Sequence, residues 1–283
     1  MDVDSNVQKR FFFGHSAPIC CFDLNANGTL LASAQEGKNS IVRVWEYGTG
    51  RCISMMTMPV NTLKCLAFSH DGKYLASVGK DSHNKELIIV WDITRIAQGQ
   101  KPEIIAKQTS DFNILSLKFS PIDSSRMASC GKENIRFWRL KEGNGAIRGS
   151  AVVLNHHARN TVFTCLDFEW GTRSVEPREN EALKRVFVGS KHGMVFQVNY
   201  HTESLEATYQ TNDSAIYSVA VNEAFCVTGS EDTYLRVWPL DFSEFFMEAK
   251  HEGTVCAVDI ATDGLRVVCG TDYGSIGILD KGS

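Results

Sequence analysis

The sequence predicts an all-β protein, a β-propeller built from six similar units. A motif of the type apolar–Arg–apolar–Trp, or a near variant, ends at Trp45, Trp91, Trp138 and Trp238. These tryptophans are 46, 47 and 100 residues apart, and the last step is about two periods. Each period contains short segments of alternating apolar and polar residues, separated by turn residues. Four such strands in a repeat of roughly 40–50 residues are typical of a propeller blade.

The first strand of each unit alternates in period two, and the six segments end at Leu24, Ser69, Pro121, Phe168, Val221 and Ile260. A small residue recurs inside these segments, namely Cys21, Cys65, Ser116, Cys165, Ser218 and Ala257. Free cysteine behaves as a small apolar side chain, so we expect tight packing at this position. A redox or metal-binding role for the cysteines is the alternative.

The remaining strands follow in a fixed order. A turn such as "NANGT" or "HDGK" leads to a second strand that ends in small residues, as in "LASAQE" and "VTGSED". The third strand carries the tryptophan, which Val198 replaces in unit four and Leu279 in unit six. A weaker fourth strand, such as Cys52–Met56 or Ser204–Tyr209, leads into the next unit.

The ends of the chain bear on the number of blades. Val7–Phe13 precedes the first unit, and we predict that it pairs with Ser275–Leu279. The N-terminal strand would then close the last blade and cover two strand edges that otherwise invite aggregation. Six blades follow if the ring is complete, whereas a seven-bladed ring lacking one blade is the alternative.

Composition and motifs narrow the functional classes. The chain is 43% apolar and 22% charged, typical of one globular domain over residues 1–283. We see no signal peptide and no apolar run of about 18 residues, so we expect no membrane span. Nine cysteines without a C-x-x-C pair fit free thiols in a reducing compartment such as the cytoplasm.

Known catalytic motifs are absent from the sequence. It contains no G-x-G-x-x-G, Walker loop, H-E-x-x-H or nucleophile elbow. The histidine pair His156-His157 is expected in a surface loop rather than at a metal. We therefore expect a binding platform: no enzyme, catalytic residue, cofactor, metal or nucleic-acid partner.

The repeat resembles the WD40 family over nearly the whole chain. Gly14-His15 matches the family's Gly-His, and Trp91-Asp92 matches its Trp-Asp. The resemblance implies a structural hydrogen-bond tetrad of His, Ser or Thr, Asp and Trp, which no unit retains completely. Its members here are His15, Ser33 and Trp45; Ser77 and Trp91; Ser129 and Trp138; and Thr228, Asp232 and Trp238.

Longer segments resemble two narrower groups. "ASCGKENIRFW" and the extended turn in "GKDSHNKELIIVW" are similar to the tandem propellers of the echinoderm microtubule-associated protein-like family. The run from Val227 to Asp280 resembles WD-repeat proteins of centrioles and cilia. This resemblance implies a microtubule-associated scaffold at the centriole, basal body or cilium, and a propeller excised from a longer multi-propeller protein. Tubulin, centriolar scaffold proteins and neighbouring propellers are the implied partners. A substrate-receptor or adaptor propeller, for example in a ubiquitin ligase, is the alternative.

Charged residues recur at one turn position, three residues after the small residue of the second strand. The six units carry Glu36, Lys80, Lys132, Lys191, Glu231 and Asp272 there. Residues 1–202 have 25 basic and 19 acidic side chains, a net +6, whereas residues 203–283 have 4 and 14, a net −10. This turn should lie on the same rim as the Gly-His loop. We predict that the lysines bind an acidic partner and that the acids meet a neighbouring propeller.

Two further features have open alternatives. Arg43, Arg136 and Arg236 stand two residues before a tryptophan, where pairing within the blade is favoured over ligand binding. The charged segment Glu169–Arg185 is far longer than the equivalent link in other units, and it reads as a projecting loop. It is either a functional loop or a tolerated insertion.

Overall fold

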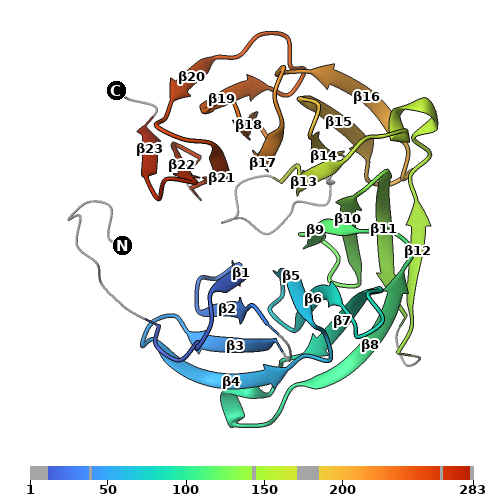
Figure 1. Ribbon diagram of the computed structural model, residues 1–283, viewed down its shortest axis with the longest axis vertical. Coiled ribbons are helices and arrows are strands. Elements are labelled where there is room, and N and C mark those ends of the chain that lie inside the picture. Colours follow the sequence, from blue (N-terminus) through green and yellow to red (C-terminus); the bar gives the residue numbers. More distant parts are fainter. Residues whose placement is uncertain (1–11, 38–39, 142–144, 171–184, 262–263, 281–283) are drawn as a thin grey trace. The chain divides into compact units, whose positions relative to one another are not determined.

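The structure is a computed structural model that describes residues 12–37, 40–141, 145–170, 185–261 and 264–280. Within these ranges, regular structure consists of 23 strands and two short 3-10 helices. The strands form six antiparallel sheets, which we call blades 1 to 6 in chain order (Figure 1). The prediction of an all-β chain with six blades is therefore confirmed. Two compact units are described in turn: residues 1–111 with 140–147, and residues 112–139 with 148–283.

The first unit contains blades 1 and 2. Blade 1 consists of β1 (Ile19–Leu24), β2 (Leu30–Gln35), β3 (Ile41–Glu46) and β4 (Arg51–Thr57). Blade 2 consists of β5 (Thr62–Phe68), β6 (Tyr74–Lys80), β7 (Glu86–Asp92) and β8 (Glu103–Ser110), with the 3-10 helix η1 (Ile96–Gln98) before β8. Val44, Leu75 and Ile89 are fully buried in a core that both blades share.

The second unit contains most of blade 3 and all of blades 4 to 6. Blade 3 consists of β9 (Ile114–Phe119), β10 (Arg126–Gly131), β11 (Asn134–Leu140) and β12 (Ile147–Ala151), followed by the 3-10 helix η2 (Asn155–Ala158). Blade 4 consists of β13 (Phe163–Phe168), β14 (Arg185–Ser190), β15 (Met194–Asn199) and β16 (Leu205–Gln210). Blade 5 consists of β17 (Ile216–Val221), β18 (Phe225–Ser230), β19 (Tyr234–Pro239) and β20 (Met247–Lys250). Blade 6 consists of β21 (Val255–Ile260), β22 (Arg266–Thr271) and β23 (Ile276–Asp280).

The second strands of blades 1 to 5 are largely buried on both faces, whereas β22 of blade 6 is partly exposed. All six residues of β10 are buried, as are five consecutive residues of β6. A strand with two covered faces needs a continuous run of apolar and small residues instead of alternation. This requirement explains why the segments "LASV" and "MASC" lack the period-two pattern of the first strands.

The first strand of every blade has an irregularity just before its small residue. The register with the second strand shifts between Ile19 and Cys21 in β1, and between Phe163 and Cys165 in β13. The same shift occurs in β5, β9, β17 and β21. A bulge of this kind bends the strand and increases its twist, so the small residue lies at a bend where a larger side chain would be crowded.

Side chains of the first strands also tie neighbouring blades together inside each unit. In the first unit, Asp23 accepts a hydrogen bond from the backbone N–H of Phe68 at 2.7 Å. In the second unit, Asp167 accepts a hydrogen bond from the backbone N–H of Val221 at 2.9 Å. The same carboxylate forms an ion pair with Lys118 at 2.7 Å. The carboxylates thus satisfy backbone donors of the adjoining first strand.

Two predicted features lie wholly or mostly outside the described residues. The proposed pairing of Val7–Phe13 with β23 involves residues 7–11, so closure by the N-terminal strand stays a prediction. Phe12 is described, and its ring packs against Trp45 and Tyr47, with centroids 5.6 and 6.0 Å apart. Residues 171–184 of the long loop are also outside, but its base is held by a bidentate pair between Arg185 and Glu169 at 2.8 Å. No helix in the described ranges has the length and apolar character needed to cross a membrane.

Candidate functional site

The charged turn residue of each blade is hydrogen-bonded through its backbone to the segment that precedes the first strand of that blade. In five blades the N–H of this residue donates to a carbonyl just before the first strand of the same blade, over 2.9–3.1 Å. The pairs are Glu36 with Pro18, Lys132 with Asn113, Lys191 with Val162, Glu231 with Ala215 and Asp272 with Thr254. In blade 2 the carbonyl of Lys80 instead accepts from Asn61 at 2.7 Å. Each charged turn therefore lies beside the segment that enters its own blade.

Within the second unit, two of the predicted lysines are brought close together. Lys132 forms an isolated bridge with Val162, and Lys191 donates its N–H to the carbonyl of the same residue. Both lysines are exposed, as are Glu231 and Asp272. In the first unit, Glu36 is exposed and Lys80 is half-buried. The prediction that these residues bind partners stays a prediction.

Three blades form the expected hydrogen bond between the tryptophan and the second strand. In blade 1, the Ser33 hydroxyl lies 2.7 Å from Trp45 Nε1 and 2.7 Å from His15 Nε2. In blade 3, Trp138 Nε1 donates to Ser129 Oγ at 2.7 Å. In blade 5, Trp238 Nε1 donates to Thr228 Oγ1 at 2.9 Å. Each of these tryptophans is almost completely buried.

Blade 2 departs from the expected tetrad. The Ser77 hydroxyl donates along its own sheet to the carbonyl of Ile89 at 3.4 Å, and Trp91 Nε1 has no hydrogen-bond partner among the described residues. The Ser77–Trp91 contact implied by the resemblance is therefore wrong. Pro59 stands where His15 stands in blade 1, six residues before the small residue of the first strand.

Blade 6 contains a pair that the sequence analysis missed. His251 Nε2 lies 3.3 Å from Cys269 Sγ. His251 stands four residues before β21, as His15 stands four residues before β1, and this spacing was the available signal. Gly277 makes the contact possible, because a Cβ there would lie 2.5 Å from His251 Cε1 and 2.8 Å from Cys269 Sγ. The pair takes the tetrad places of histidine and serine in a blade that has Leu279 for tryptophan.

Blade 5 also departs from the pattern, because Asn212 occupies the place of the tetrad histidine. Asp232 contacts Arg236 rather than a histidine, with its Oδ2 2.6 Å from Arg236 Nη1. The Asn212 amide nitrogen lies 3.4 Å from Asp232 Oδ2. Turning the amide over lets its oxygen accept from Arg236 at 2.6 Å and from Ser230 at 3.1 Å, which pairs both ends of the amide.

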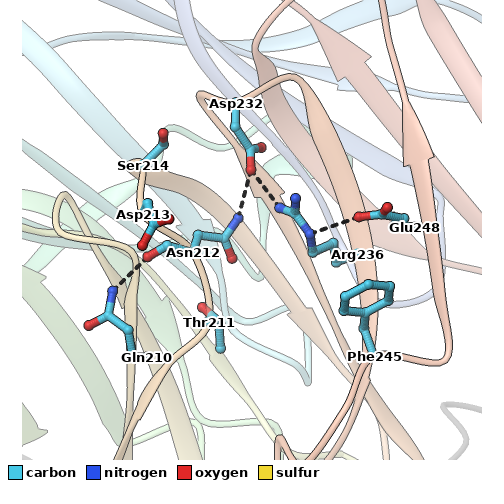
Figure 2. Close-up of a pocket in the computed structure, with 9 residues that line it drawn as sticks. All are labelled: Gln210, Thr211, Asn212, Asp213, Ser214, Asp232, Arg236, Phe245 and Glu248. Atoms are coloured by element: carbon cyan, nitrogen blue, oxygen red, sulfur yellow. Dashed lines mark hydrogen bonds and ion pairs between the residues drawn. The ribbon is translucent and has the colours of Figure 1, made fainter.

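A polar groove of about 460 Å³ opens at this place. One wall is the segment 210–214, which links blades 4 and 5. Asp232 and Arg236 lie across from it, and Phe245 and Glu248 complete the lining (Figure 2). Burial would raise the pKa of Asp232, but hydrogen bonds from Arg236 and from the Tyr234 N–H outweigh it and lower that pKa. The carboxylate is therefore held in its charged form.

The three repeat-position arginines pair within their blades, which confirms the favoured interpretation. Arg236 bridges Asp232 and Glu248, the latter at 3.2 Å. The guanidinium carbon of Arg43 lies 5.9 Å from the ring centroid of Trp45. Arg136 lies over Phe112 and Trp138 at 5.2 and 5.3 Å.

The cysteines fit the packing interpretation. All nine are free. Cys65 and Cys165 are buried, and a Cβ added at Gly189 would lie 2.7 Å from Cys165 Sγ. Burial raises the pKa of Cys165 to about 11, so its thiol stays protonated at neutral pH. Within the described ranges, no three His, Cys, Asp or Glu side chains gather in a metal-binding arrangement.

Comparison with known proteins places this repeat pattern in a family. Residues 8–276 match the family described as echinoderm microtubule-associated protein first beta-propeller. The chain belongs to this family. The β-propeller domain of Cps50 (Swd1) from Myceliophteria thermophila has the same fold, with a TM-score of 0.71 over 95% of this chain and 88% of that chain, at 14% identity.

Several relatives with higher sequence identity are longer proteins. The chain is 37% identical to WD repeat-containing protein 90 of Xenopus tropicalis over 96% of its length, and 35% identical to Centriole proteome protein 16 of Chlamydomonas reinhardtii, also over 96%. It is 24% identical to mouse Echinoderm microtubule-associated protein-like 2 over 84% of its length and 36% of that protein's. The chain spans 16% and 14% of the first two relatives' length. The resemblance to the echinoderm microtubule-associated protein-like family and the resemblance to WD-repeat proteins of centrioles are therefore confirmed.

Proposed function

We propose that this chain is a non-catalytic protein-interaction scaffold of the centriole or cilium, associated with microtubules. The observation that carries the proposal is its similarity, over nearly its whole length, to proteins named WD repeat-containing protein 90 and Centriole proteome protein 16. The name of a more distant relative contains the term microtubule-associated. In this proposal the chain supplies one propeller to a protein several times longer.

The charged turns supply a contact surface for such a role. Lys132 and Lys191 flank Val162 in the second unit and are exposed, so they can meet an acidic segment such as a tubulin tail. Glu231 and Asp272 are exposed at the equivalent turns of blades 5 and 6, where a neighbouring propeller can meet them. An exposed ion pair contributes only about 0.2–1 kcal/mol. Binding through the lysines should therefore be weak and should decrease with salt.

Microtubule co-sedimentation tests the proposal. The parent chain should pellet with microtubules at low salt and less so at high salt. A variant with Lys80→Glu, Lys132→Glu and Lys191→Glu should lose most of this binding. The matched control carries Lys73→Glu, Lys101→Glu and Lys107→Glu, three exposed lysines away from the charged turns. The lysine turns are rejected as the contact if both triple variants bind alike, and the microtubule association is rejected if the parent fails to pellet at any salt.

A further inference from the structure

One wall of the groove in blade 5, the segment 210–214, is held by hydrogen bonds to residues 192 and 193. The N–H groups of Thr211 and Asn212 both donate to the carbonyl of Gly193 at 3.0 Å. Gln210 Nε2 donates to the carbonyls of His192 and Asn212 at 3.0 and 2.6 Å. The wall formed by 210–214 is thus held before any ligand arrives, which reduces the ordering cost of binding.

The groove lies at the tetrad place of blade 5. In blade 1 the imidazole of His15 occupies the equivalent place and bonds both Ser33 and Gln35. In blade 5 this place belongs to Asn212, which is buried, and its amide faces Asp232 and Arg236 (Figure 2). These two charged side chains line the groove beside the amide.

The lining carries a net negative charge. Asp213, Asp232 and Glu248 contribute three carboxylates, and Arg236 is the single cation among the nine lining residues. Asp213 is exposed, and Glu248, with a side chain 40% exposed, contacts Arg236 through one oxygen at 3.2 Å. Both carboxylates therefore have capacity for a further hydrogen-bond donor.

An aromatic side chain stands on the Glu248 side of the groove, whereas Asp213 lies on the opposite side, on the segment 210–214 (Figure 2). Phe245 is 38% exposed and is fixed edge-on against Trp238, with ring centroids 5.5 Å apart. Phe246 and Met247 continue the exposed apolar surface. A cation placed between a carboxylate and an aromatic ring gains both an ion pair and a cation–π contact. An anion would have to displace the carboxylates that already hold Arg236.

We propose that this groove binds a lysine or arginine side chain presented by a partner peptide, with Glu248 as the ion-pair partner, Phe245 as the aromatic wall and Asp213 adding negative charge on the opposite side. The proposal concerns the groove alone and does not depend on microtubule binding or on a centriolar location. It assigns a basic partner to blade 5, whereas the lysine turns would take an acidic one.

The test uses the isotope-labelled whole chain and an unlabelled peptide, Gly-Ser-Leu-Arg-Leu-Ser-Gly, with matched peptides that carry Lys, Gln or Glu in place of Arg. NMR titration should give saturable shifts at Gln210, Phe245 and Glu248 for the Arg and Lys peptides. We expect at least about fivefold weaker binding of the Gln peptide, and no saturable shift with the Glu peptide. Raising the salt concentration should weaken binding.

Two double variants complete the experiment. Asp213→Asn with Glu248→Gln keeps the shape of the groove and should weaken binding of the Arg peptide about tenfold. Glu103→Gln with Glu223→Gln removes the same charge from exposed sites outside the groove and should bind like the parent. Circular dichroism melting identifies any variant that fails to fold. In that case the residues of the parent whose NMR signals shift with the Arg peptide decide whether the groove is the binding site. Equal binding of the Arg and Gln peptides, equal weakening in both double variants, or shifts located outside the groove would overturn the proposal.

Discussion

A hydroxyl near the middle of the second strand decides whether a blade tryptophan is hydrogen-bonded. Ser129 accepts from Trp138 at 2.7 Å, whereas Ser77 turns to a backbone carbonyl and leaves the Trp91 N–H without a partner among the described residues. Removing the partner of a buried donor costs about 1–3 kcal/mol, more than the net value of the bond itself. The two serines should therefore differ in their effect on stability, although both are buried.

Paired serine variants test this difference. Ser129→Ala should lower the free energy of unfolding by about 1–3 kcal/mol, because the buried Trp138 N–H loses its acceptor. Ser77→Ala should lower the free energy of unfolding by less than about 1 kcal/mol. It removes only the long hydrogen bond to the Ile89 carbonyl, which remains paired in its sheet. Urea unfolding of both variants measures the values. Equal losses would show that Trp91 depends on Ser77 after all.

The charge of Asp232 should make stability depend on pH. Asp232 faces Arg236, Asn212 and the Tyr234 N–H, and Glu248 shares the same guanidinium. Its pKa in the folded chain is lowered from the usual 3.8, so the folded state favours the ionised form. The stabilisation is fully present above pH 3.8 and is lost as the pH falls through the lowered folded value.

Comparison of the parent with Asp232→Asn isolates this effect. The parent should be the more stable of the two at pH 7, and the difference should shrink as the pH falls below 3.8 and through the lowered folded pKa of Asp232. Urea unfolding at several pH values provides the measurement. A difference that stays constant over this range would mean that the carboxylate charge does not contribute.

At the scale of the strand connections, one turn between second and third strands stores backbone strain. The turns after β14 and β18 have three residues and the turn after β22 has four, and the third residue of each is left-handed: Gly193 at φ 71°, Thr233 at φ 74° and Gly274 at φ 81°. Glycine adopts this conformation freely, but a β-branched residue there is an outlier that costs about 1–3 kcal/mol. Blade 5 therefore carries strain beside Asp232 that blades 4 and 6 avoid.

Exchanging these residues gives a matched pair of predictions. Thr233→Gly should raise the free energy of unfolding by about 1 kcal/mol, because relief of strain exceeds the entropic cost of glycine. Gly193→Ala should lower it by at least about 2 kcal/mol, because the added Cβ would lie 1.9 Å from the Asn212 carbonyl oxygen in a left-handed turn. Thermal melting of both variants would refute the account if Thr233→Gly destabilised the chain.

The strands themselves were largely predictable, because periodicity reports burial directly. The first strands ending at Leu24, Phe168, Val221 and Ile260 were placed correctly from alternation alone. Their bulges could not be placed, because a bulge adds a residue without changing the residue types. The contrast between Ser77 and Ser129 depends on a side-chain rotamer, and the same Ser and Trp types occur in both blades. The groove was missed because the link between Asn212 and Arg236 joins two segments 20 residues or more apart in the chain, and no short motif contains both.

At the scale of the whole chain, opposite charges are separated along the sequence. Residues 1–202 have a net charge of +6 and residues 203–283 a net charge of −10. The lysine turns of blades 2 to 4 fall in the first part, and the groove of blade 5 falls in the second. A scaffold with both surfaces can bind an acidic and a basic partner at separate places, and charge then favours the correct orientation of each.

Localisation of the tagged chain tests the central claim, that this propeller is a scaffold of the centriole or cilium. The chain would be expressed as a fluorescent fusion in ciliated cells beside a centriole marker. The Cps50 (Swd1) propeller, which shares the fold at 14% identity, is the matched control. We expect the chain to concentrate at centrioles or along the cilium while the control does not. A folded chain that spreads evenly through the cytoplasm, as the control does, would contradict the proposed function.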